Sequence, residues 1–432
     1  MHNNLRLIFG AVALLAAVPL AAQPRGDEPV AVPSSIKQGV DFVYVDPQMS
    51  SVAIKKRKPR NWLQRIFGGS REDREQRSAP HAVFLQLAQG LEDYRSTWGA
   101  LPQAQVTAGA ALRRGSTGRR VDQLRTRLGL APGGGFDEAL FQRVSEYQRV
   151  HGLDADGIAG RATIASLNAG AEHYERRIAI NMERAWRLPA TNAFERYVLV
   201  DSGAAEAYLF DRDRVTDSMR VVVGSPETKT PMMAVLMRTA KANPYWYVPP
   251  ELIRSLTARR IGQQGLSYLS EFHYEVLAEW DLTAPRVDPR TVNWKAIASG
   301  KAAPTVMVRQ LPGPWNSMGE MKFEMPNDFG IYLHDTPHKE LFAEDDRWLS
   351  NGCVRLEDYR RFASWVFDRV PQASSQLEQS FELPRPVPVY MTYLTVAPSA
   401  GSGVVFRADP YGFDALAMPQ MEFGRPGIAS AS

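Results

Sequence analysis

The apolar residues of this chain change their spacing near Pro189, and this change limits the folds that the chain can adopt. Before Pro189, apolar residues recur at intervals of three and four, as on one face of an α-helix. After it, the segments 197–203, 205–211 and 218–225 are rich in β-branched and aromatic residues and are separated by turn residues, which predicts an antiparallel meander. We therefore predict an α+β protein of 432 residues, helical in its first half and largely β in its second.

The N-terminal residues 1–22 predict a secretory signal peptide. Arg6 precedes an apolar run, residues 7–20, that ends in a pair of alanines. The run has about 14 residues against roughly 20 for a membrane-spanning helix, and its small-residue end is typical of a signal peptidase site. We therefore expect export of the protein, with an uncleaved N-terminal anchor as the alternative.

Residues 23–79 are polar and charge-dense, so we predict a poorly ordered linker there. A basic cluster at 55–60 precedes a few apolar residues, which would suit contact with a membrane or an anionic polymer. A solvated linker is the alternative, since Pro59 interrupts the cluster. With a net charge of +4 the chain is only mildly basic, and we predict no nucleic-acid partner.

Three helical parts precede Pro189. Residues 80–110 predict a helical scaffold segment, and residues 171–195 contain a linking helix. Residues 111–170 predict a compact unit of three helices whose glycines suit turns with positive φ. This unit resembles the peptidoglycan-binding domain in residues along its whole length: Gly115, Gly118, Val121, Leu124, Tyr147, Gln148, Gly152, Leu153, Asp156, Gly157, Gly160, Thr163 and Leu167. The resemblance implies binding to the cell wall; a plain helical spacer is the alternative.

The chain has a single cysteine, Cys353, which cannot form an intramolecular disulfide. Exported proteins usually pair their cysteines, so a lone thiol in such a protein has either a packing role or a chemical one. A buried, inert hydrophobe is the default for free cysteine. The residues around Cys353 favour reactivity instead.

Cys353 follows a Ser-Asn-Gly turn, and His334 lies 353 − 334 = 19 residues upstream on an apolar segment that predicts a strand. A cysteine attacks as its thiolate, so it needs a base nearby, and an imidazole serves that purpose. A helix predicted directly after Cys353 would lower the pKa of the thiol further. Gly352 would let a substrate carbonyl approach the backbone, where the Cys353 amide could stabilise the oxyanion.

A metal site is a competing hypothesis, because His334 and His338 are four residues apart like two ligands on a zinc-protease helix. Pro337 argues against that helix, and Asp335 stands where such a motif has glutamate. We therefore expect no metal at this site.

The segment around Cys353 resembles the L,D-transpeptidase catalytic (YkuD) domain, whose pattern is a histidine, a spacer and then Ser/Thr-X-Gly-Cys-hydrophobic-Arg/Asn. YLHDTP with His334 and SNGCVR with Cys353 match it. Stretches that resemble the larger periplasmic branch of that family lie at 221–233, 243–250, 314–327 and 387–396. The resemblance implies a β-sandwich-like catalytic domain over 196–398, with a helical lid insertion at 250–305 and a C-terminal extension at 399–432.

The resemblance also implies a reaction on peptidoglycan stem peptides of the meso-diaminopimelate type. Cys353 would attack the carbonyl that precedes the terminal D-alanine of a tetrapeptide stem, and an amine of a second stem would resolve the thioester into a 3–3 cross-link. His334 is the expected base, with Asp335 as local support. Arg355 would orient the catalytic turn or bind a substrate carboxylate. No cofactor is expected, and carbapenems should inhibit covalently.

Four further residues are candidates for the substrate pocket. Tyr332 and Trp246 would line it, although strand aromatics commonly belong to a core. Ser350 and Asn351 would shape the turn. Many family members carry a second histidine where this chain has Asn351, so the resemblance assigns the base to His334 alone, and the thiol would be less acidic.

Two other functions stay open from the sequence. Water instead of an amine could resolve the thioester, which would make the protein an L,D-carboxypeptidase or endopeptidase. A non-catalytic wall-binding scaffold is the second alternative. The resemblance places the protein in the periplasm, and it identifies no protein partner.

Overall fold

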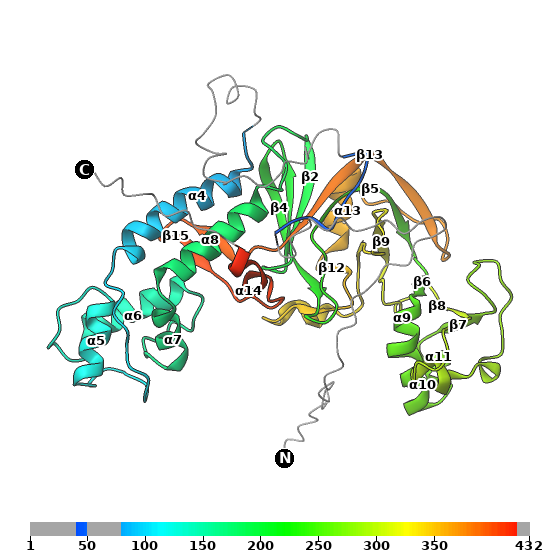
Figure 1. Ribbon diagram of the computed structural model, residues 1–432. Coiled ribbons are helices and arrows are strands. Elements are labelled where there is room, and N and C mark those ends of the chain that lie inside the picture. Colours follow the sequence, from blue (N-terminus) through cyan, green and yellow to red (C-terminus); the bar gives the residue numbers. More distant parts are fainter. Residues whose placement is uncertain (1–39, 50–78, 421–432) are drawn as a thin grey trace, which may run out of the picture.

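The computed structural model describes residues 40–49 and 79–420 (Figure 1). The predicted signal peptide and most of the predicted linker, including its basic cluster, lie outside the described residues, as do residues 421–432. Residues 40–49 fall within the predicted poorly ordered linker, but they contain a strand of the main sheet, so that prediction is wrong for this segment. Within the described part, no helix combines the length and the apolar character needed to span a membrane. Figure 1 shows the three-helix unit and the predicted insertion at opposite ends of a central sheet.

The helical first half matches the spacing of its apolar residues. Helix α4 (Ala82–Tyr94) continues into the π-helical turn η1 (Arg95–Gly99). The three-helix module consists of α5 (Arg119–Arg127), α6 (Glu138–Val150) and α7 (Arg161–Ala169). The linking helix α8 (Ala171–Ala185) follows α7 after Gly170 alone and packs along α4.

Buried polar contacts hold the turns of the three-helix module. The amide of Gln148, on α6, donates to Asp156 at 2.9 Å and to Thr163 at 3.1 Å, and its carbonyl oxygen accepts from the Gly157 N–H at 2.8 Å. Gly157 has a φ of +71°, and a Cβ there would lie 2.2 Å from the ring of Phe141. Positive φ angles also occur at the predicted turn glycines 115, 118 and 152. Gly160 is different, because its backbone is extended with a φ of −80°.

The second half is built on one curved sheet. Its strands run in the order β1-β5-β13-β2-β3-β4-β12-β10-β9, and an additional pairing of β9 with β5 joins the two ends. The meander is antiparallel, as predicted: β2 (Arg196–Asp201), β3 (Glu206–Asp211) and β4 (Arg214–Gly224). The remaining strands are β1 (Tyr44–Val45), β5 (Met233–Ala242), β9 (Met321–Glu324), β10 (Leu333–His334), β11 (Trp348–Ser350, paired with β4), β12 (Val354–Leu356) and β13 (Gln379–Thr392).

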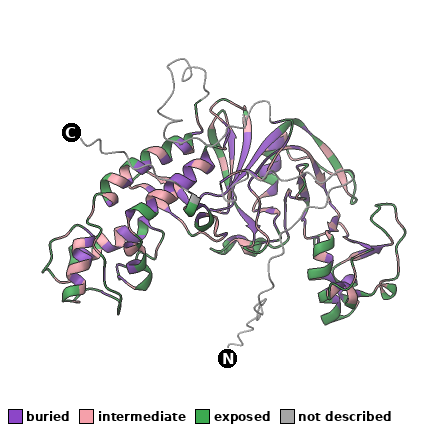
Figure 2. Ribbon diagram, in the orientation of Figure 1, coloured by how far each residue is buried: buried purple, intermediate pink, exposed green. Residues whose placement is uncertain are grey.

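Both faces of the central strands are buried, as the purple strands of Figure 2 show. On β2, Val198 and Val200 point into the core enclosed by the sheet, whereas Tyr197 and Leu199 join the core beneath the helices. Helix α13 (Tyr359–Phe367) packs its apolar face into the first of these cores. Because successive side chains of a strand point to opposite faces, a strand buried on both faces has an unbroken apolar sequence, which explains the stretch YVLV.

The insertion is not purely helical, which corrects the helical lid predicted at 250–305. It starts and ends on strands: β6 (Trp246–Val248), β7 (Tyr274–Leu277) and β8 (Met307–Gln310) form a three-stranded sheet in the order β6-β8-β7. Its helical segments are α9 (Pro250–Leu252), η2 (Ile253–Thr257), α10 (Ala258–Gln264), α11 (Ser267–Glu271), η3 (Pro289–Thr291) and α12 (Trp294–Ala298). We therefore call residues 246–310 the insertion; it has a hydrophobic core of its own.

The described part of the C-terminal extension returns to the helical half. A hairpin of β14 (Val396–Ser399) and β15 (Gly403–Phe406) contacts α4, and α14 (Phe413–Ala417), which contacts α8, is followed by η5 (Met418–Gln420). Gly90 of α4 permits this packing, because a Cβ there would lie 2.5 Å from the Val404 side chain. The extension thus joins the helical half to the sheet.

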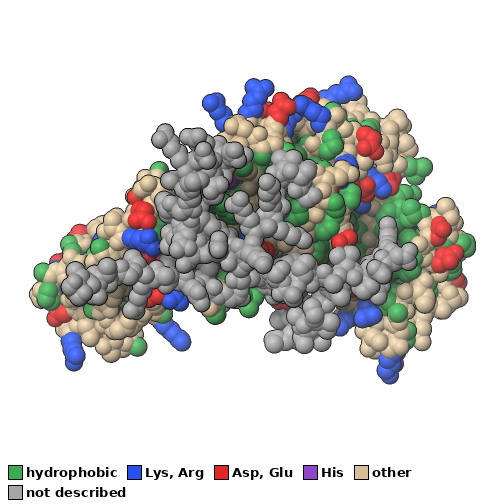
Figure 3. All heavy atoms as spheres, turned by 45° about the horizontal axis from the view of Figure 1, so that its top comes forward, with side chains coloured by type: hydrophobic (Ala, Val, Ile, Leu, Met, Phe, Trp, Pro, Cys, Tyr) green, Lys and Arg blue, Asp and Glu red, His purple; other side chains and the backbone are tan. Residues whose placement is uncertain are grey.

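Charged side chains on the surface are mixed in sign. On the face shown in Figure 3, Lys and Arg side chains lie at several separate places, some of them beside Asp and Glu. Many arginines form ion pairs, such as Arg220 with Glu357 and Arg361 with Asp217. This distribution agrees with the small net charge of the sequence.

Candidate active site

The register of three short strands brings the candidate residues together. His334 on β10 is paired with Arg355 on β12 and with Lys322 on β9. In a strand, residues two apart share a face, so Tyr332 lies beside His334, and Cys353 lies beside Arg355. The rings of Tyr332 and His334 have their centroids 6.0 Å apart. The intervening Leu333 and Val354 point into the core. The candidate residues therefore occupy the outer face of one sheet.

Cys353 is the last residue of the turn between β11 and β12, which we call the cysteine turn (residues 350–353). The thiol is half-buried, and its Sγ lies 3.7 Å from the Gly330 carbonyl oxygen. Burial raises the pKa of the Cys353 thiol, and the Tyr332 N–H, Lys322 and Arg355 offset this shift only in part. At neutral pH the resting form is the thiol.

The helix predicted directly after Cys353 is not there, which corrects that expectation. The strand β12 follows the cysteine, and α13 begins only at Tyr359, capped by the Asp358 side chain. The dipole of a helix acts within its first turn, so α13 does not acidify the thiol. Strand β12 pairs with both β4 and β10, and these pairings fix the cysteine turn in the sheet.

His334 is fixed in one tautomer by the backbone. Its Nδ1 lies 2.5 Å from the Asp335 carbonyl oxygen, which can only accept, so Nδ1 carries the proton and Nε2 has a free lone pair. Burial, together with the positive charge of Arg355, lowers the pKa of His334 to about 3. The imidazole is therefore neutral at physiological pH and able to accept a proton.

The Asp335 side chain holds the neighbouring loops. Its Oδ2 accepts from the Glu320 N–H at 2.8 Å, and its Oδ1 accepts from the Lys339 Nζ at 2.6 Å. It is the carbonyl of Asp335, and not the carboxylate, that bonds His334. Local support of the histidine, expected from the sequence, thus has a geometric basis in the main chain.

Hydroxyl groups hold the cysteine turn. The Ser350 Oγ donates to the Cys353 carbonyl oxygen at 2.6 Å and accepts from the Gly352 N–H at 3.1 Å. Gly352 has a φ of +113°, and a Cβ there would lie 3.1 Å from Ile331 Cδ1, so a larger residue would be strained. Asn351, at the tip of the turn, is exposed. This arrangement leaves Cys353 at the edge of a rigid turn.

The loop between β4 and β5 holds the cysteine turn through hydrogen bonds. We call residues 224–230 the supporting loop. The Thr228 Oγ1 donates to the Ser350 carbonyl oxygen at 2.9 Å, and the Thr230 Oγ1 donates to the Gly352 carbonyl oxygen at 2.8 Å. Sequence reasoning missed both threonines, although the stretch that contains them, 221–233, showed the family resemblance.

Arg355 and Lys322 place two positive charges beside the cysteine. Arg355 is half-buried, and its Nε has no hydrogen-bond partner among the described residues. Burial lowers the pKa of its guanidinium. Lys322, which sequence reasoning also missed, lies 4.3 Å over the ring of Tyr332 and pairs with Glu324 at 3.0 Å. Lys322 lies in the stretch 314–327, which showed the family resemblance.

The two aromatic candidates have different surroundings. Trp246 is buried at 7% exposure in the core of the insertion, so the structure places it away from an open pocket wall. Tyr332 is half-buried beside Cys353 and packs against the same core. Burial raises the pKa of the Tyr332 phenol, so it stays protonated. The candidate site thus lies between the outer face of the sheet and the insertion.

The second histidine of the metal hypothesis lies elsewhere. His338 is exposed, and its Nδ1 bonds Glu340 at 3.1 Å, whereas His334 is buried on the sheet. The two side chains thus lie in different surroundings. Within residues 40–49 and 79–420, no group of three or more potential ligands has the geometry to hold a metal ion.

Two parts of the chain match known protein families. Residues 195–389 match the family model of the L,D-transpeptidase catalytic domain, and this range contains every strand residue of the site. The chain carries an L,D-transpeptidase catalytic domain. Residues 122–167, in the three-helix module, match the model described as "Putative peptidoglycan binding domain".

One curated relative agrees with the family match. A curated protein of Haemophilus influenzae, described as "Putative L,D-transpeptidase", is 30% identical over 268 residues, which cover 59% of this chain and 52% of the relative. The chain therefore spans about half the length of that relative. Among solved structures, the L,D-transpeptidase from Mycobacterium smegmatis is similar at 16% identity and a TM-score of 0.23, over 46% of this chain and 58% of that one. LdtMt1 in complex with imipenem is similar at 12% identity over the same shares, also with a TM-score of 0.23.

The candidate site lies on the sheet of this domain, and its residues come from distant stretches of sequence. The cysteine and the histidine were found from their motif, and the turn that carries the cysteine was expected. The supporting loop and Lys322 have no motif of their own, because their roles depend on the register of neighbouring strands.

Proposed function

We propose that the protein is an L,D-transpeptidase that forms 3–3 cross-links between peptidoglycan tetrapeptide stems through a thioester on Cys353. The observation that carries the proposal is the placement of Cys353 and a neutral His334 on one face of adjacent strands, with His334 Nε2 unprotonated. The family of residues 195–389 supports the substrate class, and the peptidoglycan-binding domain supports its location in the cell wall. Export to the periplasm belongs to this proposal.

The first half-reaction consumes one stem and releases D-alanine. As the Cys353 sulfur attacks the carbonyl that precedes the terminal D-alanine, His334 Nε2 takes the thiol proton. We assign the Cys353 N–H, at the end of the cysteine turn, as a donor to the developing oxyanion. When the C–N bond breaks, His334 returns the proton to the leaving amine, and a thioester remains.

The second half-reaction resolves the thioester with the side-chain amine of a second stem. His334 accepts a proton from the attacking amine and returns it to the cysteine sulfur as the C–S bond breaks. In the first half-reaction, Arg355 lies two residues beyond the cysteine with an Nε that has no hydrogen-bond partner among the described residues, which suits the carboxylate of the departing D-alanine. If water enters instead of the amine, the same thioester is hydrolysed.

A reaction with purified disaccharide-tetrapeptide tests the proposal. We expect the full-length protein to release D-alanine and to form cross-linked dimers, detected by mass spectrometry, and Cys353→Ala to do neither. His334→Gln should lose nearly all turnover, whereas His338→Gln, a matched change at an exposed histidine, should keep it. D-alanine release without dimers would identify a hydrolase. Unchanged turnover by Cys353→Ala would contradict the nucleophile.

Covalent labelling gives an independent measurement. A carbapenem has a strained amide carbonyl that the Cys353 sulfur can attack, with cleavage of the ring C–N bond and transfer of the thiol proton to that nitrogen. We expect one adduct per chain in the wild type and none in Cys353→Ala, since the chain has a single cysteine. Absence of the adduct in the wild type would argue against the proposed function.

A further inference from the structure

The C-terminal extension reaches the region beneath the cysteine turn through Tyr411. This residue is 3% exposed, and its ring stacks on that of Tyr393, with centroids 4.9 Å apart and planes inclined by 9°. The Tyr411 hydroxyl donates to the Gly224 carbonyl oxygen at 2.7 Å and accepts from the Thr230 N–H at 3.3 Å. One side chain of the extension therefore holds both ends of the supporting loop.

The supporting loop passes this restraint to the cysteine turn. The Thr230 hydroxyl accepts from the Gly224 N–H at 2.9 Å and donates to the Gly352 carbonyl oxygen at 2.8 Å. In addition, the Ser225 N–H donates to the Ser350 carbonyl oxygen at 2.9 Å. Thr230 therefore bonds both the Tyr411 hydroxyl and Gly352, the residue directly before Cys353. Because these groups are buried, each hydrogen bond would leave an unsatisfied group if it broke.

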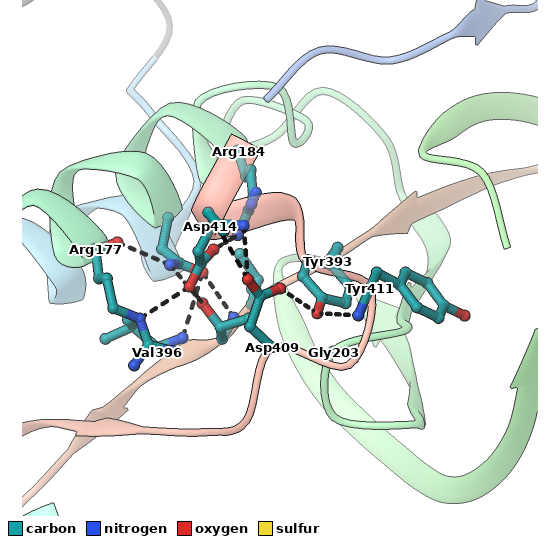
Figure 4. Close-up of polar contacts among 12 residues, drawn as sticks. Arg177, Arg184, Gly203, Tyr393, Val396, Asp409, Tyr411 and Asp414 are labelled. Carbon is teal, nitrogen blue, oxygen red and sulfur yellow. Dashed lines mark hydrogen bonds and ion pairs between the residues drawn. The ribbon is translucent and has the colours of Figure 1, made fainter. Parts of the chain in front are cut away.

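Tyr411 is itself fixed by a buried polar network, which Figure 4 shows. The Tyr393 hydroxyl accepts from the Tyr411 N–H at 3.0 Å and donates to Asp409 at 2.7 Å. Asp409 also accepts from the backbone N–H of Asp414 at 3.0 Å, at the start of α14. The position of Tyr411 is thus tied to the placement of that helix.

Asp414 anchors α14 to the linking helix. Its two oxygens accept from Arg177 at 2.9 Å and from Arg184 at 2.6 Å, both on α8, and from the Thr395 hydroxyl at 2.6 Å. Burial alone would raise the pKa of Asp414, but Arg184 and Arg177 outweigh this and hold it below its usual value. The network remains ionised at neutral pH, and it ties the extension to the helix that leaves the peptidoglycan-binding domain.

We propose that Tyr411 is a positioning residue for the L,D-transpeptidase reaction, which acts on Cys353 through the supporting loop and the cysteine turn. It touches neither the substrate nor the reacting atoms. The C-terminal extension therefore belongs to the catalytic machinery as well as to the interface with the helices. The inference rests on the proposed function, since it concerns how the acylated cysteine is held.

Tyr411→Phe in the full chain tests the proposal, because it removes only the hydroxyl. Acylation of Cys353 by a carbapenem should slow by about tenfold, since a small displacement of the turn spoils its alignment with the carbonyl. The kcat for tetrapeptide should fall by a similar factor, while KM stays the same. Alkylation of the thiol by iodoacetamide should change less than about twofold, because that reaction needs no aligned oxyanion donor.

Tyr390→Phe is the matched control. Its hydroxyl is also buried, on β13, but has no hydrogen-bond partner among the described residues, so its removal should leave acylation at the wild-type rate. A folded Tyr411→Phe protein with wild-type acylation and kcat would overturn the inference. If the wild type is not acylated at all, it is the proposed function that fails.

A second pair of variants covers the case in which Tyr411→Phe does not fold. Thr230→Val removes the hydroxyl that bonds Gly352, whereas Thr230→Ser keeps it. We expect the serine variant to retain most of the acylation rate and the valine variant to lose about tenfold. Equal rates for the two variants would show that the path from Tyr411 to the turn does not position Cys353, and would overturn the inference.

Discussion

At the scale of single residues, the two proposed catalytic groups are both neutral at rest. Burial raises the pKa of the Cys353 thiol and lowers the pKa of the His334 imidazole to about 3. A resting thiolate and imidazolium pair is therefore disfavoured in the free protein. In the proposed mechanism the proton therefore moves as the substrate carbonyl is attacked, with His334 as the general base.

This protonation state predicts the pH dependence of acylation. The reactive form has a neutral His334 and a thiol on Cys353, and it predominates from above the pKa of His334, about 3, to the raised pKa of the thiol. Acylation by a carbapenem should therefore be nearly constant between about pH 5 and about pH 8. An acid limb centred near the pKa of free histidine would contradict the assignment.

Lys322 offers a second prediction at this scale. Its positive charge lowers the pKa of the Cys353 thiol, and Glu324 would keep a second cationic partner, Lys241 at 3.5 Å, if Lys322 were replaced. Lys322→Met should raise the thiol pKa and slow acylation by about threefold to tenfold, whereas Lys322→Arg should stay close to the wild type. The rate of alkylation by iodoacetamide as a function of pH measures the thiol pKa. An unshifted profile in the methionine variant would remove Lys322 from the site.

At the scale of elements, the short strand β12 decides the electrostatics of the site. Its three residues lie between the cysteine turn and α13, so the thiol stands at the edge of a sheet and not at a helix N-terminus. From the sequence we expected a helix directly after Cys353. The residues there pair with β4 and β10 instead, because strand order is set by contacts between distant segments.

The cysteine turn itself can be tested through Gly352. Its φ of +113° and the 3.1 Å approach of Ile331 to an added Cβ mean that Gly352→Ala strains the turn, at a cost of about 1 to 3 kcal/mol in the free energy of unfolding. Acylation of Cys353 should fall at least tenfold, about the effect of a misplaced nucleophile. Gly401→Ala is the control, since that glycine has open space around it and no positive φ. Thermal denaturation and acylation rates measure the two effects, and equal behaviour of the variants would contradict the role of the turn.

At the scale of the whole molecule, three buried histidines make the stability of the fold depend on pH. Burial lowers the pKa of His81 to about 4 and the pKa values of His151 and His334 to about 3. His151 lies in the peptidoglycan-binding domain, where it bonds Tyr94 of α4 at 3.0 Å, and His334 lies in the catalytic sheet. Protonation of these histidines at low pH therefore affects the stability of both the peptidoglycan-binding domain and the catalytic sheet.

The sign of the effect follows from proton linkage. The folded protein keeps these imidazoles neutral, whereas the unfolded chain takes up protons below about pH 6.5, so their contribution to stability is present above that pH and is lost as the pH falls. We expect the melting temperature to decrease steadily from pH 7 to pH 4. His338→Gln, at an exposed histidine, should leave the decrease unchanged. A constant melting temperature over this range would contradict the prediction.

Much of the architecture could be predicted from local patterns. The period of the apolar residues identified the helices of the first half and the meander of the second, because a buried face repeats every 3.6 residues in a helix and every two in a strand. The motif around Cys353 and His334 identified the family. The insertion was recognised as a separate segment, but its three-stranded sheet was missed, since its strands are short and β6 and β7 both pair with β8, which lies far along the chain from each of them.

The sequence by itself determined the candidates for the proposed chemistry: a single cysteine, a histidine in a predicted strand and a glycine turn directly before the cysteine. Only the tertiary structure decided how they are held. Burial keeps the thiol protonated, the register of β9, β10 and β12 placed Lys322 and Arg355 near it, and the return of the C-terminal extension placed Tyr411 beside the loop that holds the cysteine turn. Burial and hydrogen bonding of these groups arise between segments far apart in the chain, where no local pattern records them.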